Sequence, residues 1–175
     1  VDAITQAQVR WSDRVKGVIG AMEPAPDPEL GRLFVGLDPA GATGTGDDTV
    51  FCFRRGPHVL TFKHAKGLND EMHLMRLLGL LSERVAPGEV PVVVLDASGS
   101  IGASLGGRLR GYVEQHPRAF RLIALASSAK STVVYCDRVR DEVTDRLEKW
   151  LRAGGETPAD DKRAAEMHVM EWETP

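Results

Sequence analysis

The sequence reads LFVGLDPAG at residues 33–41 and VVVLDASGS at residues 92–100. Each stretch begins with a short apolar run typical of a buried strand, and each run ends in an aspartate followed by small residues that include glycine. The two aspartates are Asp38 and Asp96. If the two strands are parallel neighbours, both carboxylates emerge at the same edge of the sheet, where open α/β sheets place their ligands. This pair of matching strand ends determines both the expected fold and the candidate site.

The segments around these two stretches predict an α/β fold. Residues 49–53 and 58–63 are apolar runs on either side of a turn signature, RRGP at residues 54–57, so they predict a hairpin that extends the first strand into an antiparallel meander. Helices and strands then alternate, which implies right-handed crossovers: a helix over residues 69–85, a strand over 90–95, a helix after Gly102, a strand over 120–125 and a helix over 139–151. This order predicts a mixed five-stranded sheet, three antiparallel strands followed by βαβ units, flanked by helices.

The first predicted helix begins after Asn69, a favourable N-cap residue, and ends before Ala86-Pro87-Gly88. Its apolar residues recur at helical spacing. We expect the buried stripe to consist of Met72, Met75, Leu78 and Leu81, widened by Leu74, Leu77 and Leu80.

Length and composition predict a single domain with an N-terminal extension. The chain has 175 residues, of which 42% are apolar, enough for one well-buried domain. Prolines at positions 24, 26 and 28 favour an extended connector, and residues 1–22 before it are typical of a short helix. We therefore expect residues 1–29 to form an N-terminal helix and an interdomain linker, and residues 30–175 to form the domain.

Several classes of protein are excluded by the same sequence. No apolar run approaches the roughly 20 residues that cross a bilayer, and no secretory signal pattern begins the chain, so no membrane association is expected. Cys52 and Cys136 lie far apart without a CxxC motif, which argues against a disulfide framework or a structural zinc site and favours a reducing, cytoplasmic setting. The net charge of −3 argues against a general nucleic-acid binder. Residues 97–155, however, contain ten Lys/Arg and six Asp/Glu, which fits either a phosphate-facing surface or a solvated helical face.

The chemistry expected at the paired aspartates is that of a divalent cation. A single strand-ending aspartate is more often a turn or cap residue than a ligand, but two carboxylates at close range repel each other unless a proton or a cation neutralises them. Mg²⁺ prefers oxygen ligands of this kind. Two such ions about 4 Å apart can activate a water and stabilise the leaving oxygen of a phosphodiester, so the pair predicts hydrolysis of nucleic acid.

Four segments in a fixed order carry a resemblance to a known family: VGLDPAG with GDDTV at residues 35–41 and 46–50, VVLDASGSIG at 93–102, YCDRVRDE at 135–142 and EKWLRAGG at 148–155. Together they resemble the C-terminal nuclease domain of the phage terminase large subunit, the DNA-packaging motor of tailed phages, whose fold is ribonuclease H-like. The resemblance implies that Asp38 and Asp96 bind catalytic Mg²⁺ or Mn²⁺, two ions in all, and that the domain cleaves concatemeric double-stranded DNA. It also implies an N-terminal ATPase domain in the intact protein, a small terminase subunit and a portal as partners, and the host cytoplasm as location.

The resemblance leaves the third metal-binding acid open. The family places it late in the domain, and Asp161, next to Asp160, is the candidate catalytic and metal-binding residue here. The alternative is that both match the loop after Gly154-Gly155, in which case the third acid lies beyond Pro175.

Four further residues are candidates for binding. Asp48, beside Asp47 in the loop before the second strand, is a candidate metal ligand, although such a pair more often caps a Gly-rich turn. Lys130, Arg138 and Arg140 are candidate DNA-phosphate contacts, with a solvated helix face as the alternative.

Two other functions remain open on the sequence. DPAGAT at residues 38–43 loosely resembles the phosphate loop of actin-like and sugar-kinase ATP-binding lobes, which need a second lobe. The second alternative is a catalytically inactive ribonuclease H-like module that docks other packaging proteins. Residues 41–46 lack the lysine of a P-loop, so this segment is not a motor site.

Overall fold

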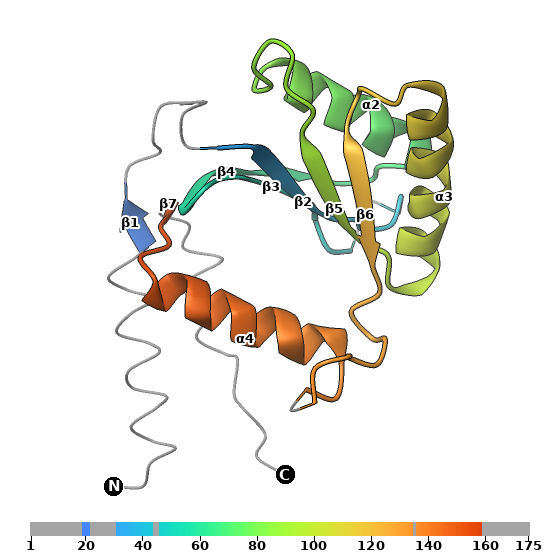
Figure 1. Cartoon of the computed structure of the whole chain (residues 1–175). Helices are drawn as coiled ribbons and strands as arrows, with labels where there is room; N and C mark the ends of the chain where they lie inside the picture. Colours follow the sequence, from blue (N-terminus) through green and yellow to red (C-terminus); the bar gives the residue numbers. More distant parts are fainter. Residues whose placement is uncertain (1–18, 22–30, 44–45, 135, 159–175) are drawn as a thin grey trace, which may run out of the picture.

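The computed structural model describes residues 19–21, 31–43, 46–134 and 136–158 (Figure 1). Its centre is a five-stranded sheet with the strand order β4-β3-β2-β5-β6. β2, β3 and β4 pair antiparallel, whereas β5 pairs parallel with both β2 and β6. The strands are β2 (Leu33–Asp38), β3 (Thr49–Arg55), β4 (His58–Ala65), β5 (Val92–Asp96) and β6 (Arg121–Leu125). The mixed sheet predicted from the sequence is therefore confirmed.

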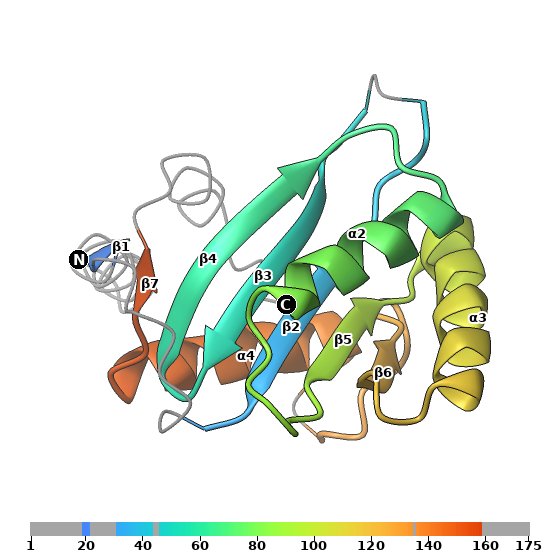
Figure 2. The ribbon, with the colours of Figure 1, turned by 90° about the horizontal axis from the view of Figure 1, so that it is seen from above.

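One face of this sheet holds the core. Helices α2 (Asp70–Ser82) and α3 (Gly99–Gln115) are the two crossovers, and their leucines pack against alternate residues of the strands. Two views show α2 on one side of the sheet and α4 (Val139–Arg152) on the other (Figures 1 and 2). The buried cluster includes Leu33, Val35, Leu37, Phe51, Phe53, Leu74, Leu77, Val93, Leu95, Leu105 and Leu109. Because side chains alternate along a strand, the remaining positions face the opposite side, towards α4.

Helix α2 begins as predicted, and four leucines of its predicted stripe are buried: Leu74, Leu77, Leu80 and Leu81. The two methionines of that stripe are not. The Asn69 side chain accepts a hydrogen bond from the backbone N–H of Met72, as an N-cap should. Met72 and Met75, expected in the core, are 47% and 61% exposed. His73 is fully buried instead, because both of its ring nitrogens have hydrogen-bond partners inside the protein. A polar residue thus holds a core position that the hydrophobicity pattern assigned to methionine.

Helix α4 ends at Arg152, and its C-cap residue Ala153 precedes the predicted Gly154-Gly155 stop. Gly154 adopts a φ of 90°, which favours glycine, and a Cβ on Gly155 would lie 2.3 Å from the Trp150 ring. Charged pairs one turn apart, such as Asp145 with Lys149, line the helix. Val143, expected on the packed stripe, is 48% exposed, because the described part of the chain does not cover that face.

A second, two-stranded sheet joins the two ends of the described chain. β1 (Ile19–Ala21) pairs parallel with β7 (Thr157–Pro158). The helix predicted over residues 1–22 is wrong at these three positions, because they pair with β7 in a strand, and residues 1–18 lie outside the described part. No helix in the described residues is long and apolar enough to span a bilayer.

An ion pair between buried Arg55 and partly buried Glu89 holds the end of β3 that lies away from the candidate site. Both nitrogens at the tip of Arg55, whose side chain is 2% exposed, bond the two carboxylate oxygens of Glu89 at 2.9 and 2.7 Å. The same carboxylate accepts hydrogen bonds from the backbone N–H groups of Leu33 and Ala86. Burial by itself raises the pKa of Glu89, but the hydrogen bonds from Arg55 and the two N–H groups together outweigh it and lower the pKa to about 2. The pair therefore ties β3 to the segment that leads into β5.

Candidate active site

Asp38 and Asp96 are the last residues of β2 and β5, which are parallel neighbours. Leu37 pairs with Leu95 in this ladder, so the two aspartates occupy the next matching positions on adjacent strands. Adjacent strands lie about 4.8 Å apart. The structure therefore brings the two predicted carboxyl-bearing residues together at one edge of the sheet.

Both aspartates also belong to the same face of the sheet. Leu33, Val35 and Leu37 point into the core, so Asp38 projects from the other side of β2, where it is exposed. Asp96 follows the same alternation on β5, since Val93 and Leu95 are buried and Asp96 is partly exposed. Two carboxylates on one face and one edge, both reachable from solvent, are an arrangement that attracts a divalent cation.

Asp96 is held by the loop that follows it. Its Oδ1 accepts a hydrogen bond of 2.9 Å from the backbone N–H of Ser98. The Ser98 hydroxyl lies 2.7 Å from that of Ser127 and accepts the Ser127 backbone N–H at 2.9 Å. Because Ser127 belongs to the loop after β6, the exits of β5 and β6 are fastened to each other beside the acid.

Gly102 brings helix α3 against the backbone of Asp96. A Cβ at this position would lie 2.4 Å from the Asp96 carbonyl oxygen and 2.8 Å from backbone atoms of Ala97. Real Cβ atoms do not approach backbone so closely, so any larger residue has to displace either the helix or the end of β5. The SGSIG segment noted in the sequence is therefore a close-packing feature beside the candidate site.

We predict that Gly102→Ala lowers the free energy of unfolding by about 1–3 kcal/mol and weakens Mn²⁺ binding, because the added methyl pushes against the backbone that bears Asp96. Denaturant unfolding and calorimetry with Mn²⁺ measure the two effects. Gly107→Ala is the matched control, since Gly107 lies on the same helix with nothing within 4 Å of its would-be Cβ. That change should be neutral or stabilising. Equal effects of the two substitutions would contradict the close-packing role of Gly102.

Asp48 lies beside two basic side chains. Asp48 directly precedes β3, at the same edge as Asp38, and its side chain is 17% exposed. Its Oδ1 lies 3.4 Å from Lys66 Nζ, and its Oδ2 lies 3.7 Å from His64 Nδ1. A metal ion at Asp48 would share this carboxylate with the ammonium group of Lys66, and the metal-binding role of Asp48 stays a prediction.

The third predicted acid, Asp161, lies outside the described residues. Among residues 31–43, 46–134 and 136–158, no group of three or more His, Cys, Asp or Glu side chains is arranged to hold a metal ion. Within this part of the chain, the candidate site therefore consists of Asp38 and Asp96.

Lys130 and Arg138 lie in the segment between β6 and α4, Arg140 lies in the first turn of α4, and all three are exposed. The backbones of Lys130 and Arg138 pair in an isolated antiparallel β-bridge. The backbone N–H of Arg140 donates to the Ser127 carbonyl at 3.0 Å. Ser127 in turn contacts Ser98, two residues after Asp96. The three predicted cations are therefore brought to the edge of the sheet that bears the two acids.

Sequence reasoning missed two polar residues that lie behind Asp38. Thr49 and His73 are fully buried, and the Thr49 hydroxyl bonds both the His73 ring and the backbone N–H of Ala40, two residues after Asp38. The available signal was weak: a threonine at a strand start and a histidine at helical spacing among leucines are common in cores.

Comparison with solved structures identifies the fold. The large terminase nuclease of the thermophilic phage G20c with bound magnesium superposes with a TM-score of 0.65 at 14% identity, covering 93% of this chain and 80% of that one. The nuclease domain of the large terminase subunit gp2 of bacterial virus Sf6 gives 0.58 at 14% identity, covering 94% and 82%. This chain has the terminase nuclease fold. Other structures of these two proteins contain zinc or cobalt (G20c) and calcium or manganese (the K428A mutant of Sf6). No protein-family model and no curated protein sequence matches the chain.

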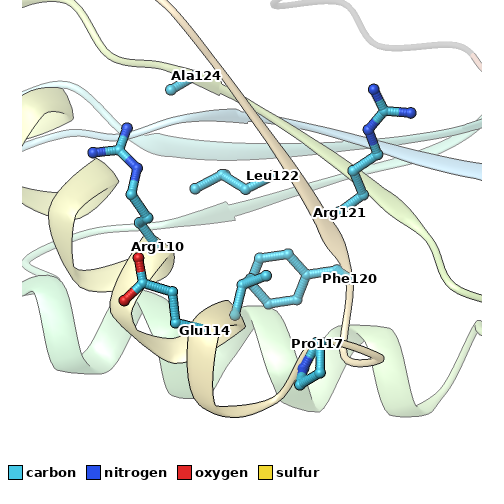
Figure 3. A pocket seen from close by; sticks show the side chains of 8 residues that line it. Arg110, Glu114, Pro117, Phe120, Arg121, Leu122 and Ala124 are labelled. Atoms are coloured by element: carbon cyan, nitrogen blue, oxygen red, sulfur yellow. The ribbon is translucent and has the colours of Figure 1, made fainter.

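The hollows on the described part of this terminase nuclease fold include two near α3. One, of about 530 Å³, lies beside the acidic edge between the loop after β2, the first turn of α2 and the first turn of α3, and Gly41, Asn69 and Ser104 line it. The other, of about 360 Å³, lies between α3 and β6, lined by Arg110, Glu114 and Leu122 among others (Figure 3). Neither hollow is lined by a predicted site residue.

Proposed function

We propose that this chain is a divalent-metal-dependent endonuclease that cleaves double-stranded DNA, as the nuclease domain of a phage large terminase. The observation that supports the proposal best is the pair Asp38 and Asp96 at matching positions of two parallel strands, on one face and one edge of the sheet. The fold shared with the G20c and Sf6 nucleases also supports a nuclease function. In the proposed context, the natural substrate is concatemeric phage DNA in the host cytoplasm, and an ATPase domain, a small subunit and a portal are the partners.

The residues of this edge fit a hard divalent cation. Carboxylate oxygens are the ligands that Mg²⁺ and Mn²⁺ prefer, and both acids are accessible to solvent and so to a DNA phosphate. The solved nucleases of this fold contain magnesium, manganese and other divalent metals, which supports the same choice for this chain. Asp161 is the proposed third ligand.

The side chains at this edge would have different roles in catalysis. Bound metal, in the proposal two ions, would activate a water and stabilise the leaving oxygen of the phosphodiester. Asp38 and Asp96 would hold the metal and set its position, with the Ser98 N–H fixing one oxygen of Asp96. Lys130, Arg138 and Arg140 would bind phosphates beside the acids and orient the duplex without reading its sequence.

Digestion of supercoiled plasmid by the 175-residue chain tests the proposal. With Mn²⁺ or Mg²⁺ we expect nicked and then linear DNA, and with EDTA no change. The Asp38→Asn/Asp96→Asn double variant, purified in parallel, controls for contaminating nucleases. An RNA–DNA hybrid and a single-stranded RNA of equal length should be cleaved more slowly than the DNA duplex. Plasmid that stays supercoiled with both metals, or that is cut equally by the double variant, would overturn the proposal and favour an inactive docking module.

We predict that Lys130→Gln/Arg140→Gln weakens binding to duplex DNA and lowers the slope of log K against log salt by about 2, because each lost phosphate contact releases about one counterion fewer. Fluorescence anisotropy with EDTA, over a range of NaCl concentrations, measures both quantities without cleavage. Arg110→Gln is the control, since Arg110 lines the hollow between α3 and β6 (Figure 3). An equal loss of slope for Arg110→Gln would show that the cations act through net charge rather than through contacts at the acidic edge.

A further inference from the structure

The loop that follows Asp38 is tied to helix α2 through the interior of the protein. The backbone N–H of Ala40 donates a hydrogen bond of 2.9 Å to the Thr49 hydroxyl. That hydroxyl lies 2.8 Å from His73 Nε2, and His73 Nδ1 lies 2.9 Å from the Asn69 carbonyl oxygen. Three hydrogen bonds thus connect Ala40, at one end, to the N-cap residue of α2 at the other.

The direction of each hydrogen bond follows from its neighbours. A carbonyl oxygen can only accept, so His73 Nδ1 bears the proton that is donated to Asn69. Burial lowers the pKa of His73, which keeps the ring neutral and leaves Nε2 as an acceptor for the Thr49 hydroxyl proton. The Thr49 oxygen then accepts the Ala40 N–H. Each side-chain polar atom in this series of hydrogen bonds therefore has a partner, and both Thr49 and His73 are 0% exposed.

Pro39 makes this anchor effective for Asp38. Proline has no N–H and a fixed φ near −65°, so Ala40 offers the first N–H after Asp38 that the protein can hold. Before it, the β2 ladder pairs Asp38 with Val50 of β3. The backbone of Asp38 is therefore fixed on its N-terminal side by the sheet and on its C-terminal side by Thr49. Thr49 lies on the buried face of β3, opposite the face that bears the carboxylate, so the anchor leaves the acidic edge open.

We propose that Thr49 and His73 are positioning residues for Asp38, which hold its backbone so that the carboxylate meets the metal and the scissile phosphate in register with Asp96. This role rests on the proposed nuclease function. Metal ligands must be held within about 0.5 Å of the productive geometry, and a misplacement of about 1 Å can cost roughly 100-fold in rate. A structural role alone would affect stability and leave this geometry unchanged.

Thr49→Val and Thr49→Ser separate the two possibilities. Valine keeps the shape of threonine but removes the hydroxyl, whereas serine keeps the hydroxyl. We expect Thr49→Val to lower the cleavage rate about 10- to 100-fold at saturating Mn²⁺, with unchanged affinity for duplex DNA, and Thr49→Ser to retain the wild-type rate. Thr61→Val is the matched control. Thr61 is also buried and pairs with Phe53 across the β3–β4 ladder, and its hydroxyl donates to the Phe62 carbonyl rather than accepting the Ala40 N–H.

Amide hydrogen exchange at Ala40 measures the anchor without any nuclease activity. In the wild-type chain the Ala40 N–H should be protected from exchange. Thr49→Val should speed its exchange about tenfold, which corresponds to the free energy of one hydrogen bond. Thr61→Val should leave the exchange slow. An Ala40 amide that exchanges as fast in the wild type as an unprotected loop amide overturns the anchor, even if Thr49→Val does not fold. A wild-type chain that cleaves DNA while Thr49→Val cleaves equally fast overturns the positioning role alone. A wild-type chain that does not cleave overturns the proposed function instead, whatever the exchange shows.

Discussion

Replacing Asp38 or Asp96 by asparagine is expected to lower metal-dependent DNA cleavage on the order of 10³-fold, because a metal site supplies several kcal/mol of transition-state stabilisation. Asparagine is the informative substitution. It retains an Oδ1 that can accept the Ser98 N–H at position 96, so the loop after β5 stays in place while the negative charge is lost. Initial rates of plasmid nicking at saturating Mn²⁺ measure the effect.

The same two variants should lose the stabilisation that metal gives to the wild type. A ligand that binds only the folded protein stabilises it by about 2.7 kcal/mol at 100 times its Kd. We therefore expect Mn²⁺ to raise the melting temperature of the wild type and to leave that of Asp38→Asn nearly unchanged. Without metal, Asp38→Asn should melt close to the wild type, since Asp38 is an exposed side chain.

Glu114→Gln is the control for both measurements. It makes the same change from carboxylate to amide on an exposed residue of α3, in the hollow away from the acidic edge (Figure 3). Wild-type cleavage and a wild-type metal shift are expected for it. If Asp38→Asn or Asp96→Asn cleaves DNA as fast as Glu114→Gln does, the paired carboxylates do not hold the catalytic metal.

The position of the acidic pair was predictable because it depends on local patterns. Two apolar runs that end in an aspartate specify two strand ends, and the alternation of a helix with strands makes the strands parallel. Parallel neighbours then place Asp38 and Asp96 at one edge without any knowledge of side-chain packing. Lys130 and Arg140 follow a third strand of the same direction, so the topology also brings them to this edge.

What the sequence did not predict depends on contacts between distant residues. Thr49 and His73 meet through a packing of β3 on α2 that no local pattern encodes, and a buried histidine then displaces the expected methionines from the core stripe. The strand at Ile19–Ala21 forms because β7, which lies more than 130 residues later in the sequence, pairs with it. The basic side chains beside Asp48 come from β4 and the residue after it, on the other strand of the hairpin.

The ion pair of buried Arg55 with partly buried Glu89 leads to the second large effect. Glu89→Gln is expected to lower the free energy of unfolding by about 3–5 kcal/mol, because it leaves the buried guanidinium of Arg55 without a counter-charge. The new amide group would also place N–H donors among the N–H groups of Arg55, Leu33 and Ala86, which need an acceptor. Glu83→Gln is the control, since Glu83 is 64% exposed and should change stability by less than about 0.5 kcal/mol.

The pH dependence of stability distinguishes the ion pair from simple packing. The pKa of Glu89 is lowered from 4.5 to about 2 in the folded protein, so the unfolded chain takes up the proton first as the pH falls. The stability from this shift, roughly 3 kcal/mol, is therefore fully present above pH 4.5 and is lost progressively as the pH falls towards 2. Glutamine has no such proton to take up, so the difference in unfolding free energy between wild type and Glu89→Gln should be largest at pH 7 and should shrink by pH 3. Urea unfolding at pH 7, 4.5 and 3 measures it. A difference that stays constant over this range would mean that Glu89 stabilises the fold through its shape and hydrogen bonds, and that its charge contributes nothing.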